Sequence, residues 1–471
     1  MNPSVVIIGG GFSGVATAVN LAAASPRPLA ITIVEPAPVL GRGVAYGTDD
    51  PDHRLNGPSN VHFLSLGDTE HFTRWHAESG ARDGDPESVV GSAVFPRRRD
   101  FAAYLAAEVD AAVTANRSGS SIEHRRSRAV DGSGGRVGLD DGTDLAADLV
   151  VITTSNGPPG IPAGLGGIVG APGFIADPWA DGATDAVPES GRVLMIGTGL
   201  TMADQVVTLQ RDRPEVEITA ISRRGLLPRS LPTTSRGLNM IDVLTTRAPA
   251  FLERHHDVSS TRRALRVVRE EIAALTAAGE EWHAAFDELR DAAHVLWPRL
   301  PGAEQARFAR HLAAWYEVHR FRFPPPTERV IGSALQSGAL VTEAARVVHS
   351  SRNGAGLEVE RRRRTCGESL TERFDAVVNC TGPERSPRRA GDPFLTSLAE
   401  AGTIVPHPLG MGIVVDEHSQ AIACDERADP QLRVVGPLAR GRFGECMGVP
   451  HIVARLADVM PSMIRLTEES R

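Results

Sequence analysis

Lysine is absent from this sequence, so all 50 of its basic residues are arginine. That absence excludes Schiff-base catalysis, attachment of pyridoxal phosphate and a P-loop, because each needs a lysine amine. Any phosphate group must instead be bound by arginine, by backbone N–H groups or by a helix N-terminus.

Cysteine is also scarce, with four residues at positions 366, 380, 424 and 446. No two of them form a C-x-x-C pair, so a dithiol relay of the disulfide-reductase kind is not expected. Few, scattered cysteines fit a reducing compartment. The apolar segment 5–24 lacks a basic flank and is interrupted by glycines, and no run reaches the length of a membrane span. These features predict a cytoplasmic protein without membrane partners.

Positive charge is not in excess either, since the net charge is −8. Nucleic-acid-binding surfaces are usually basic, so no nucleic-acid partner is expected. A hydrophobic content of 41% is ordinary for a globular protein. The 471 residues exceed what one core usually serves, which predicts two domains.

A glycine turn near the N-terminus carries the strongest motif. Gly9-x-Gly11-x-x-Gly14 follows the apolar run 4–8 and precedes a helical pattern over 13–24. Gly9 permits the turn, Gly11 lets a pyrophosphate approach the backbone, and Gly14 lets the helix pack on the strand. Glu35 ends the next strand and can accept hydrogen bonds from a ribose. With Phe12 and Ser13 in the same turn, this unit predicts dinucleotide binding.

A second glycine turn, Gly197-x-Gly199, follows the strand 193–196 and precedes a helix from about residue 200 to 210. Its sixth position is Met202, so the helix should lie slightly farther from the strand. Arg223 and Arg224 follow the next strand, where the first unit has Glu35. Two guanidiniums there suit a 2′-phosphate and favour NADPH over NADH, although both could be solvated surface charges.

The segment from about 236 to 328 has an amphipathic helical pattern, with Trp297 and Trp315 among the expected buried anchors. We therefore predict an α/β protein with two Rossmann-like dinucleotide-binding domains and a helical insertion in the second. The expected first domain comprises residues 1–188 and 391–471, and the second comprises 189–390.

Several segments together resemble the two-dinucleotide-domain flavoproteins, which include flavin-containing and N-hydroxylating monooxygenases. The narrower resemblance is to a bacterial subgroup of FAD/NAD(P)-binding proteins that contains an FAD-dependent urate hydroxylase. The segments that carry it are 41–47 (GRGVAYG), 55–58 (LNGP), 197–204 (GTGLTMAD), 379–383 (NCTGP), 436–441 (GPLARG) and, more weakly, 315–320 (WYEVHR).

The resemblance implies FAD at the first glycine turn and NADPH at the second. It implies that the loop 42–58 lies over the flavin, and that Gly436 and the helix after Pro450 approach the flavin ring. The further residues expected to bind cofactor are Arg42, Tyr46, Asn56, Gly436, Val449, Leu200, Thr201, Asp204, Cys380, Thr381 and Gly382.

Four positions depart from the family pattern. The strand ending at Ile152 is followed by Thr-Thr-Ser instead of Ala-Thr-Gly, Gly444 stands where a large aromatic residue is expected, and His451 stands in place of an acid. These changes are expected to enlarge or repolarise the wall beside the flavin, so the urate hydroxylase's substrate is not carried over.

The combined pattern predicts an FAD-dependent, NADPH-consuming monooxygenase that uses molecular oxygen and a flavin C4a-hydroperoxide to hydroxylate a small nitrogen-containing metabolite. His53, His62 and His451 are the candidates for proton transfer, although any one of them could be a surface or hydrogen-bonded histidine. Hydroxylation at carbon or at nitrogen stays open. So do an NADPH-dependent reductase or oxidase without oxygen insertion, and a non-catalytic nucleotide-binding protein. The sequence predicts no metal site and no particular oligomeric state.

Overall fold

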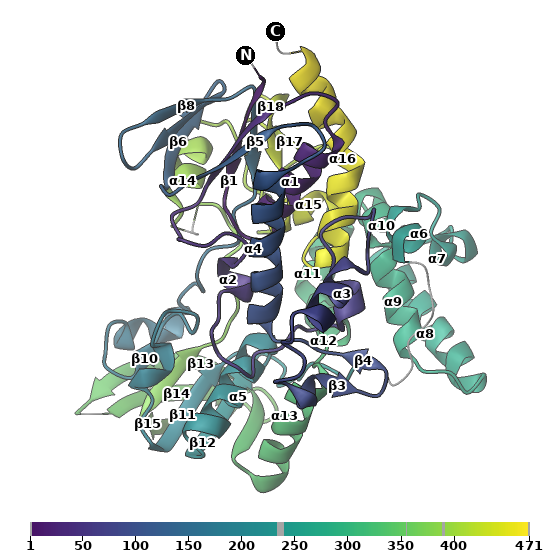
Figure 1. Cartoon of the computed structure of the whole chain (residues 1–471). Helices are drawn as coiled ribbons and strands as arrows, with labels where there is room; N and C mark the ends of the chain where they lie inside the picture. Colours follow the sequence, from purple (N-terminus) through teal and green to yellow (C-terminus); the bar gives the residue numbers. More distant parts are fainter. Residues whose placement is uncertain (1, 233–239, 355, 389–390, 470–471) are drawn as a thin grey trace.

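The computed structural model describes residues 2–232, 240–354, 356–388 and 391–469. Two open sheets lie one above the other, and a group of helices stands to one side of both (Figure 1). Both chain ends lie at the far end of the first sheet's domain (Figure 1). The predicted α/β fold with two dinucleotide-binding domains is confirmed.

The first sheet is six-stranded in the order β17-β18-β9-β1-β2-β5, and all of its strands except the edge strand β17 run parallel. Its helices α1, α4 and α16 contribute to one buried cluster, and α14 with a small antiparallel sheet, β6-β7-β8, covers the other face. Ile8 pairs in register with both Val34 and Ile152, so β1, β2 and β9 end at one edge. Ligands of such sheets bind beyond that edge. The bounds are β1 Ser4–Ile8, α1 Phe12–Ala24, β2 Ala30–Val34, α4 Arg98–Thr114, β5 Ser121–Arg125, β6 Ala129–Ser133, β7 Arg136–Leu139, β8 Asp144–Ala146, β9 Leu149–Ile152, α14 Pro393–Glu400, β17 Gln420–Ile422, β18 Ala428–Val434, α15 Arg440–Phe443 and α16 Val449–Glu469.

The second sheet is seven-stranded in the order β10-β16-β11-β12-β13-β14-β15. Helices α5 and α13 pack on one face of its parallel part, and residues 163–168 pack on the other. β10 lies before the domain boundary expected at residue 188, yet it pairs with β16, so the second sheet starts earlier in the chain than predicted. The bounds are β10 Phe174–Ile175, β11 Ser190–Ile196, α5 Leu200–Asp212, β12 Glu215–Ser222, α13 Pro325–Ser337, β13 Leu340–Asn353, β14 Gly356–Arg363, β15 Ser369–Phe374 and β16 Ala376–Asn379.

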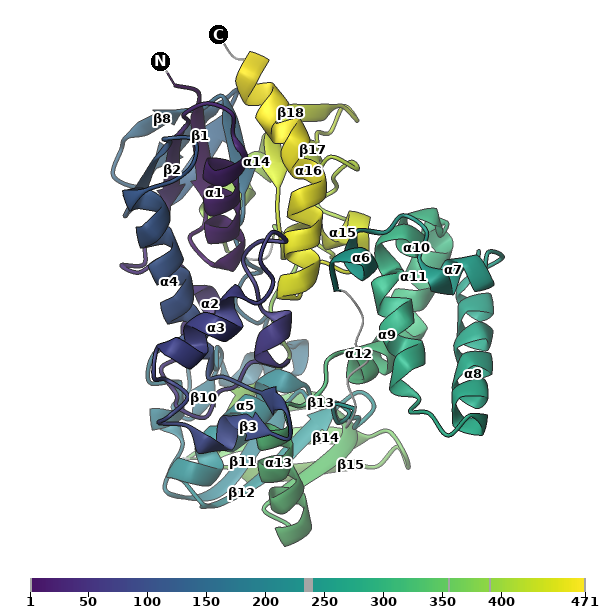
Figure 2. The same ribbon diagram turned by 45° about the vertical axis from the view of Figure 1, so that its right-hand side comes forward.

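The helical insertion forms a separate layer beside the two sheets (Figure 2). It ends with α12, whereas α13 packs on α5 and leads into β13, so the predicted end at 328 falls inside a helix of the second domain. Trp297 is buried as expected, but Trp315 is 40% exposed and is not a core anchor. The bounds are α6 Met240–Thr245, α7 Ala250–Arg254, α8 Thr261–Ala277, α9 His283–Asp291, α10 Ala293–Arg299, α11 Gly302–His311 and α12 Ala313–Arg320.

The glycine- and proline-rich stretch 40–66 is mostly irregular, as expected, with a short helix α2 (Gly43–Tyr46) and a 3₁₀ turn at Ser59–Val61. Helix α3 (His71–Glu78) and the hairpin β3 (Val89–Val90) and β4 (Ala93–Val94) follow it before α4 begins. Within the described residues, no helix combines the length and the apolar character that crossing a membrane requires.

Candidate functional site

The three glycines of the first turn differ in backbone conformation and surroundings. Gly9 has φ +106°, and a side chain on Gly14 would lie 2.0 Å from the carbonyl oxygen of Gly9. Gly11 has φ −73°, which any residue can adopt, and a Cβ there would meet nothing closer than 3.6 Å. Gly9 and Gly14 therefore serve the backbone and the packing, whereas Gly11 leaves space open at the N-terminus of α1. Phe12 and Ser13 are buried in the first turn of that helix.

Polar groups around this space fit a dinucleotide. Glu35 Oε2 accepts the N–H of Gly10 at 2.8 Å, and its Oε1 accepts the N–H of Ala37 at 2.9 Å. These bonds fix the carboxylate at the turn, and each oxygen has a further lone pair for a ribose hydroxyl. The Thr154 hydroxyl is buried there with no hydrogen-bond partner among the described residues. A buried polar atom of this kind favours a ligand as its partner.

The segments that the resemblance assigns to the flavin do gather at the first turn. A Cβ on Gly11 would face the Cα of Gly43, and a Cβ on Gly436 would lie 2.4 Å from Ser13 Oγ. Tyr46 packs edge-on against the ring of Phe101. Arg42 is bonded to Asp49 and to the carbonyl of Gly47, Asn56 is exposed beside Arg98, and Val449 begins α16 as a buried residue.

The second turn repeats this construction. Gly197 has φ +118°, and a Cβ there would lie 2.1 Å from the carbonyl oxygen of Cys380. Gly199 has φ −90° and no atom within 4 Å of a Cβ position, so it also leaves open space. Leu200 and Thr201 form the first turn of α5 above it. The segment of Cys380, Thr381 and Gly382 follows β16 directly, and Thr381 Oγ1 donates to Asn379 Oδ1 at 2.7 Å. Burial raises the pKa of the Cys380 thiol, so it is no nucleophile at neutral pH.

The two arginines after β12 have different surroundings. Arg223 is exposed, whereas Arg224 is half-buried, with its guanidinium 5.4 Å from the Trp315 ring centroid. Arg224 Nη2 also donates to the carbonyl of His311 at 3.4 Å. Both stay predicted 2′-phosphate ligands.

Asp204 lies on α5, after the second glycine turn, and its carboxylate already has a hydrogen-bond partner. Its Oδ2 accepts from Arg98 Nη2 at 2.8 Å, and both side chains are buried. Arg98 also donates to the carbonyl of Arg54, so this arginine joins α5 to the loop of the first domain. The sequence analysis missed Arg98. Its signal was the run of three arginines at 97–99 at the start of a helix, because cations are unfavourable at a helix N-terminus unless carboxylates pair with them.

Two of the three candidate histidines lie in structural positions. His53 is buried, with Nδ1 at 2.9 Å from Thr48 Oγ1 and Nε2 at 3.0 Å from Thr208 Oγ1, so it bridges the two domains. His62 is bonded to the carbonyl of Pro58, and burial lowers its pKa to about 4. Its ring is therefore neutral near pH 7. These placements favour the structural alternative for both residues.

His451 differs, because neither ring nitrogen has a hydrogen-bond partner among the described residues although the side chain is buried. Its Nε2 lies 3.8 Å from Asp291 Oδ1 of the insertion, and burial lowers its pKa. Of the three histidines, His451 alone keeps both nitrogens available inside the protein. It stays the best-placed candidate for proton transfer.

The departure at Gly444 does not enlarge the wall as expected. A Cβ on Gly444 would lie 2.6 Å from Cβ of Trp297, which the helical insertion supplies. Trp297 Nε1 also donates to the carbonyl of Gly441 at 2.9 Å. The indole therefore fills the space that an aromatic residue at 444 would take, and it fastens the insertion to the segment before α16.

A buried ion pair also joins the helical insertion to the segment before α16. Glu445 is 1% exposed. It accepts two hydrogen bonds from Arg320, one from Nη2 at 3.0 Å and one from Nε at 3.2 Å. Although burial opposes the charged form, the guanidinium of Arg320 and the neighbouring His451 and Arg440 hold the pKa of Glu445 at about 2. The carboxylate is therefore charged throughout the neutral range.

Replacing Glu445 with glutamine is expected to lower the free energy of unfolding at pH 7 by about 3 kcal/mol, because Arg320 loses its buried partner. The folded pKa is below the ordinary value of 4.5, so this contribution is complete above about pH 5 and is lost as the pH falls towards 2. Urea unfolding at pH 3 to 7 should show the two proteins converging at the acid end. Glu417→Gln removes a carboxylate that is exposed and 3.8 Å from Arg442, and should change little. A difference that stays constant with pH would contradict the ion-pair explanation.

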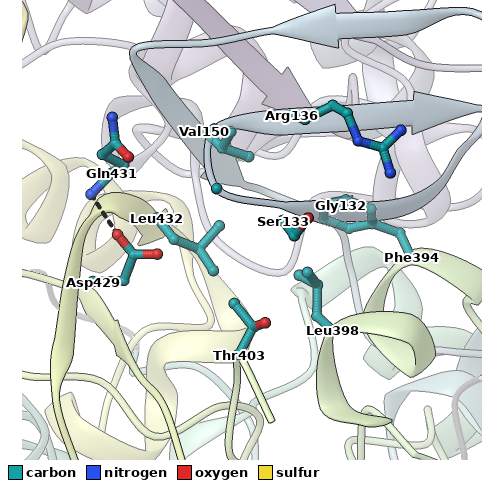
Figure 3. Close-up of a pocket in the computed structure, with 12 residues that line it drawn as sticks. Gly132, Ser133, Arg136, Val150, Phe394, Leu398, Thr403, Asp429, Gln431 and Leu432 are labelled. Carbon is teal, nitrogen blue, oxygen red and sulfur yellow. Dashed lines mark hydrogen bonds between the residues drawn. The ribbon is translucent and has the colours of Figure 1, made fainter. Parts of the chain in front are cut away.

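Figure 3 shows a shallow pocket with an internal volume of only about 20 Å³. It lies between the small sheet of β6 and β7, the start of α14 and the strand β18, and none of the predicted cofactor residues lines it. It holds no group of titratable side chains suited to the predicted chemistry, so the glycine turns remain the candidate site.

Comparisons with known proteins agree with this geometry. Residues 6–157 match a family model described as FAD-NAD(P)-binding. No curated protein matches the sequence significantly. Among solved structures, the chain is similar to L-lysine 6-monooxygenase from Pseudomonas syringae, with 15% identity, a TM-score of 0.65 and coverage of 99% of this chain and 100% of the other.

Two further solved structures share the whole fold. An ornithine N-hydroxylase from Kutzneria, solved with reduced FAD, NADP⁺ and L-ornithine, has 18% identity, a TM-score of 0.62 and 99% coverage of both chains. A cadaverine monooxygenase from Erwinia amylovora, bound to FAD, has 12% identity, a TM-score of 0.61 and coverage of 98% of this chain and 94% of the other. At these identities the likeness establishes a common two-domain fold.

Proposed function

We propose that the protein is an FAD- and NADPH-dependent monooxygenase that hydroxylates a small nitrogen-containing metabolite. The observation that carries this proposal is the pair of open glycine turns, at Gly11 and Gly199, each at a helix N-terminus in the fold that the N-hydroxylating monooxygenases share. A pyrophosphate at each turn would meet backbone N–H groups and the positive end of a helix dipole.

The chain's own residues would divide the work between the two turns. Glu35 would hold the ribose of FAD, and the loop around Tyr46 would cover the flavin. Arg223 and Arg224 would select NADPH through its 2′-phosphate. Bound FAD would supply the redox and oxygen chemistry, which needs no triad or metal. The contacts of Arg98 and His53 would hold the two domains in register, so that the nucleotides meet between them.

A finer proposal concerns the subgroup. The segments 41–47, 197–204, 379–383 and 436–441 support a place beside the FAD-dependent urate hydroxylase. The substrate is proposed to differ, because His451, a buried histidine without a hydrogen-bond partner among the described residues, stands where an acid is expected.

The proposal is tested by reducing the FAD-loaded protein anaerobically with NADPH or NADH in parallel, and then mixing it with oxygenated buffer. Faster reduction by NADPH, followed by a transient flavin absorbance that forms only with oxygen, is the expected result. Direct reoxidation with stoichiometric peroxide, in the presence and absence of candidate amines and heterocycles, would instead identify an oxidase or reductase. A protein that takes up no FAD would overturn the proposal in favour of the non-catalytic alternative.

A further inference from the structure

Two arginines and one glutamate come together where both domains meet the helical insertion. Arg385 follows the Gly382 segment of the second domain, and Arg440 follows the Gly436 segment of the first. Glu317 lies on α12 of the insertion, with Oε1 at 3.7 Å from Nη1 of Arg385 and 4.0 Å from Nη2 of Arg440. Figure 2 shows α12 between the second sheet and α15. The predicted cofactor segments thus lead directly into this group.

Positive charge is in excess within the group. Arg440 is 6% exposed, and its Nη1 has no hydrogen-bond partner among the described residues. Its Nε donates to the carbonyl of Gly444 at 3.3 Å, and its Nη2 lies 4.0 Å from Glu317. Glu445 is also close enough for the charge of Arg440 to lower its pKa, but both carboxylate oxygens of Glu445 accept from Arg320. A buried guanidinium N–H without an acceptor is costly, so a missing acceptor is indicated.

Two of the neighbouring carboxylates are engaged by other arginines. Glu445 is bonded through both oxygens to Arg320, and Asp291 accepts from Arg290 Nε at 2.7 Å. Glu384, next to Arg385 in the chain, has an oxygen that accepts the N–H of Ser386. Burial and the nearby charge of Arg440 lower the pKa of Arg385, although Glu317 and Glu384 act in the opposite direction. The carboxylates near Arg440 thus leave its buried Nη1 without an acceptor.

We propose that Arg385 and Arg440 bind an anionic group of the substrate, so that the metabolite hydroxylated is a small organic anion. Two guanidiniums suit paired acceptor oxygens, as in a carboxylate or the ionised lactam of a nitrogen heterocycle. Glu317 orients both arginines from the insertion. This inference rests on the proposed function for the reaction, but the anion site itself follows from the three side chains alone.

Isothermal titration calorimetry on the full chain, saturated with FAD, tests the site with named probes. Benzoate and barbiturate are the anionic probes. Benzamide is the neutral counterpart of benzoate, and benzylamine is its cationic counterpart. The wild type should bind at least one anion and neither counterpart. Arg440→Gln and Arg385→Gln should each weaken that binding roughly ten- to a hundredfold, since each removes charge-assisted hydrogen bonds. Arg442→Gln is the matched control, because Arg442 lies on the same helix α15 and forms an ion pair with the exposed Glu417, at 3.8 Å.

The outcomes separate this site from the proposed reaction. Benzoate binding without barbiturate binding would identify a carboxylate site, and the reverse would identify a heterocycle site. Equal affinity for benzamide, unchanged binding in both arginine variants, or no anion binding by a protein that NADPH reduces would each overturn the proposal. So would a matching loss of FAD or NADPH affinity, which would assign the guanidiniums to a cofactor. Arginine-dependent anion binding by a protein that NADPH does not reduce would support the site while refuting the proposed function.

Discussion

Replacing Gly11 with valine is expected to give a folded protein that no longer retains FAD. The φ of −73° suits valine, and the nearest atom to a Cβ at this position is 3.6 Å away, so the fold has room for the side chain. The same room is what a pyrophosphate needs to reach the backbone at the N-terminus of α1. Losing two charge-assisted bonds there would raise the Kd for FAD by about a hundredfold or more.

Absorbance at 450 nm per mole of purified protein measures this loss, and thermal unfolding of both apoproteins measures the fold. Gly14→Ala is the informative companion, because its Cβ would lie 2.0 Å from the carbonyl oxygen of Gly9. That variant should lose stability first, by about 1–3 kcal/mol, and FAD only as a consequence. If the Gly11 variant kept its flavin, the open space above Gly11 would not be the pyrophosphate site.

The contrast between these two glycines shows what the sequence can predict. Their spacing between a strand and a helix is local, so Gly9, Gly11 and Gly14 could be given separate roles from the motif alone, and the structure has them in those positions. The second turn and the insertion followed from the same kind of local periodicity. The domain boundary was harder to predict, because β10 pairs with β16, a strand about 200 positions later in the chain.

Contacts between the domains could not be predicted, because no local pattern encodes them. His53 is a plausible proton carrier by its place in a flavin-side loop, yet its partner Thr208 lies on α5 of the other domain. Gly444 alone predicts a wider wall beside the flavin, but Trp297 of the insertion fills that space in the structure. A histidine or a glycine can have several structural or catalytic roles. Which role it has depends on a contacting residue that lies far away in the sequence.

Replacing Gly199 with valine is expected to leave the protein yellow but no longer reducible by NADPH. The backbone φ of −90° accepts valine, and no atom lies within 4 Å of the new Cβ, so neither the fold nor the first turn is disturbed. The isopropyl group would occupy the approach of the NADPH pyrophosphate to the N-terminus of α5. The second-order rate of flavin reduction should fall about a hundredfold or more, while FAD content and melting temperature stay near those of the wild type.

Stopped-flow reduction under anaerobic conditions gives the rate, and dithionite gives a chemical control, since it reduces bound flavin without the second turn. Gly302→Val is the matched substitution, because Gly302 is exposed at the start of α11 and also has no atom within 4 Å of a Cβ. It should reduce like the wild type. Together with the Gly11 variant, this result would assign one nucleotide to each turn: loss of FAD at the first, and loss of hydride transfer with FAD retained at the second. Normal NADPH reduction in the Gly199 variant would place the hydride donor elsewhere and leave the second turn a purely structural element.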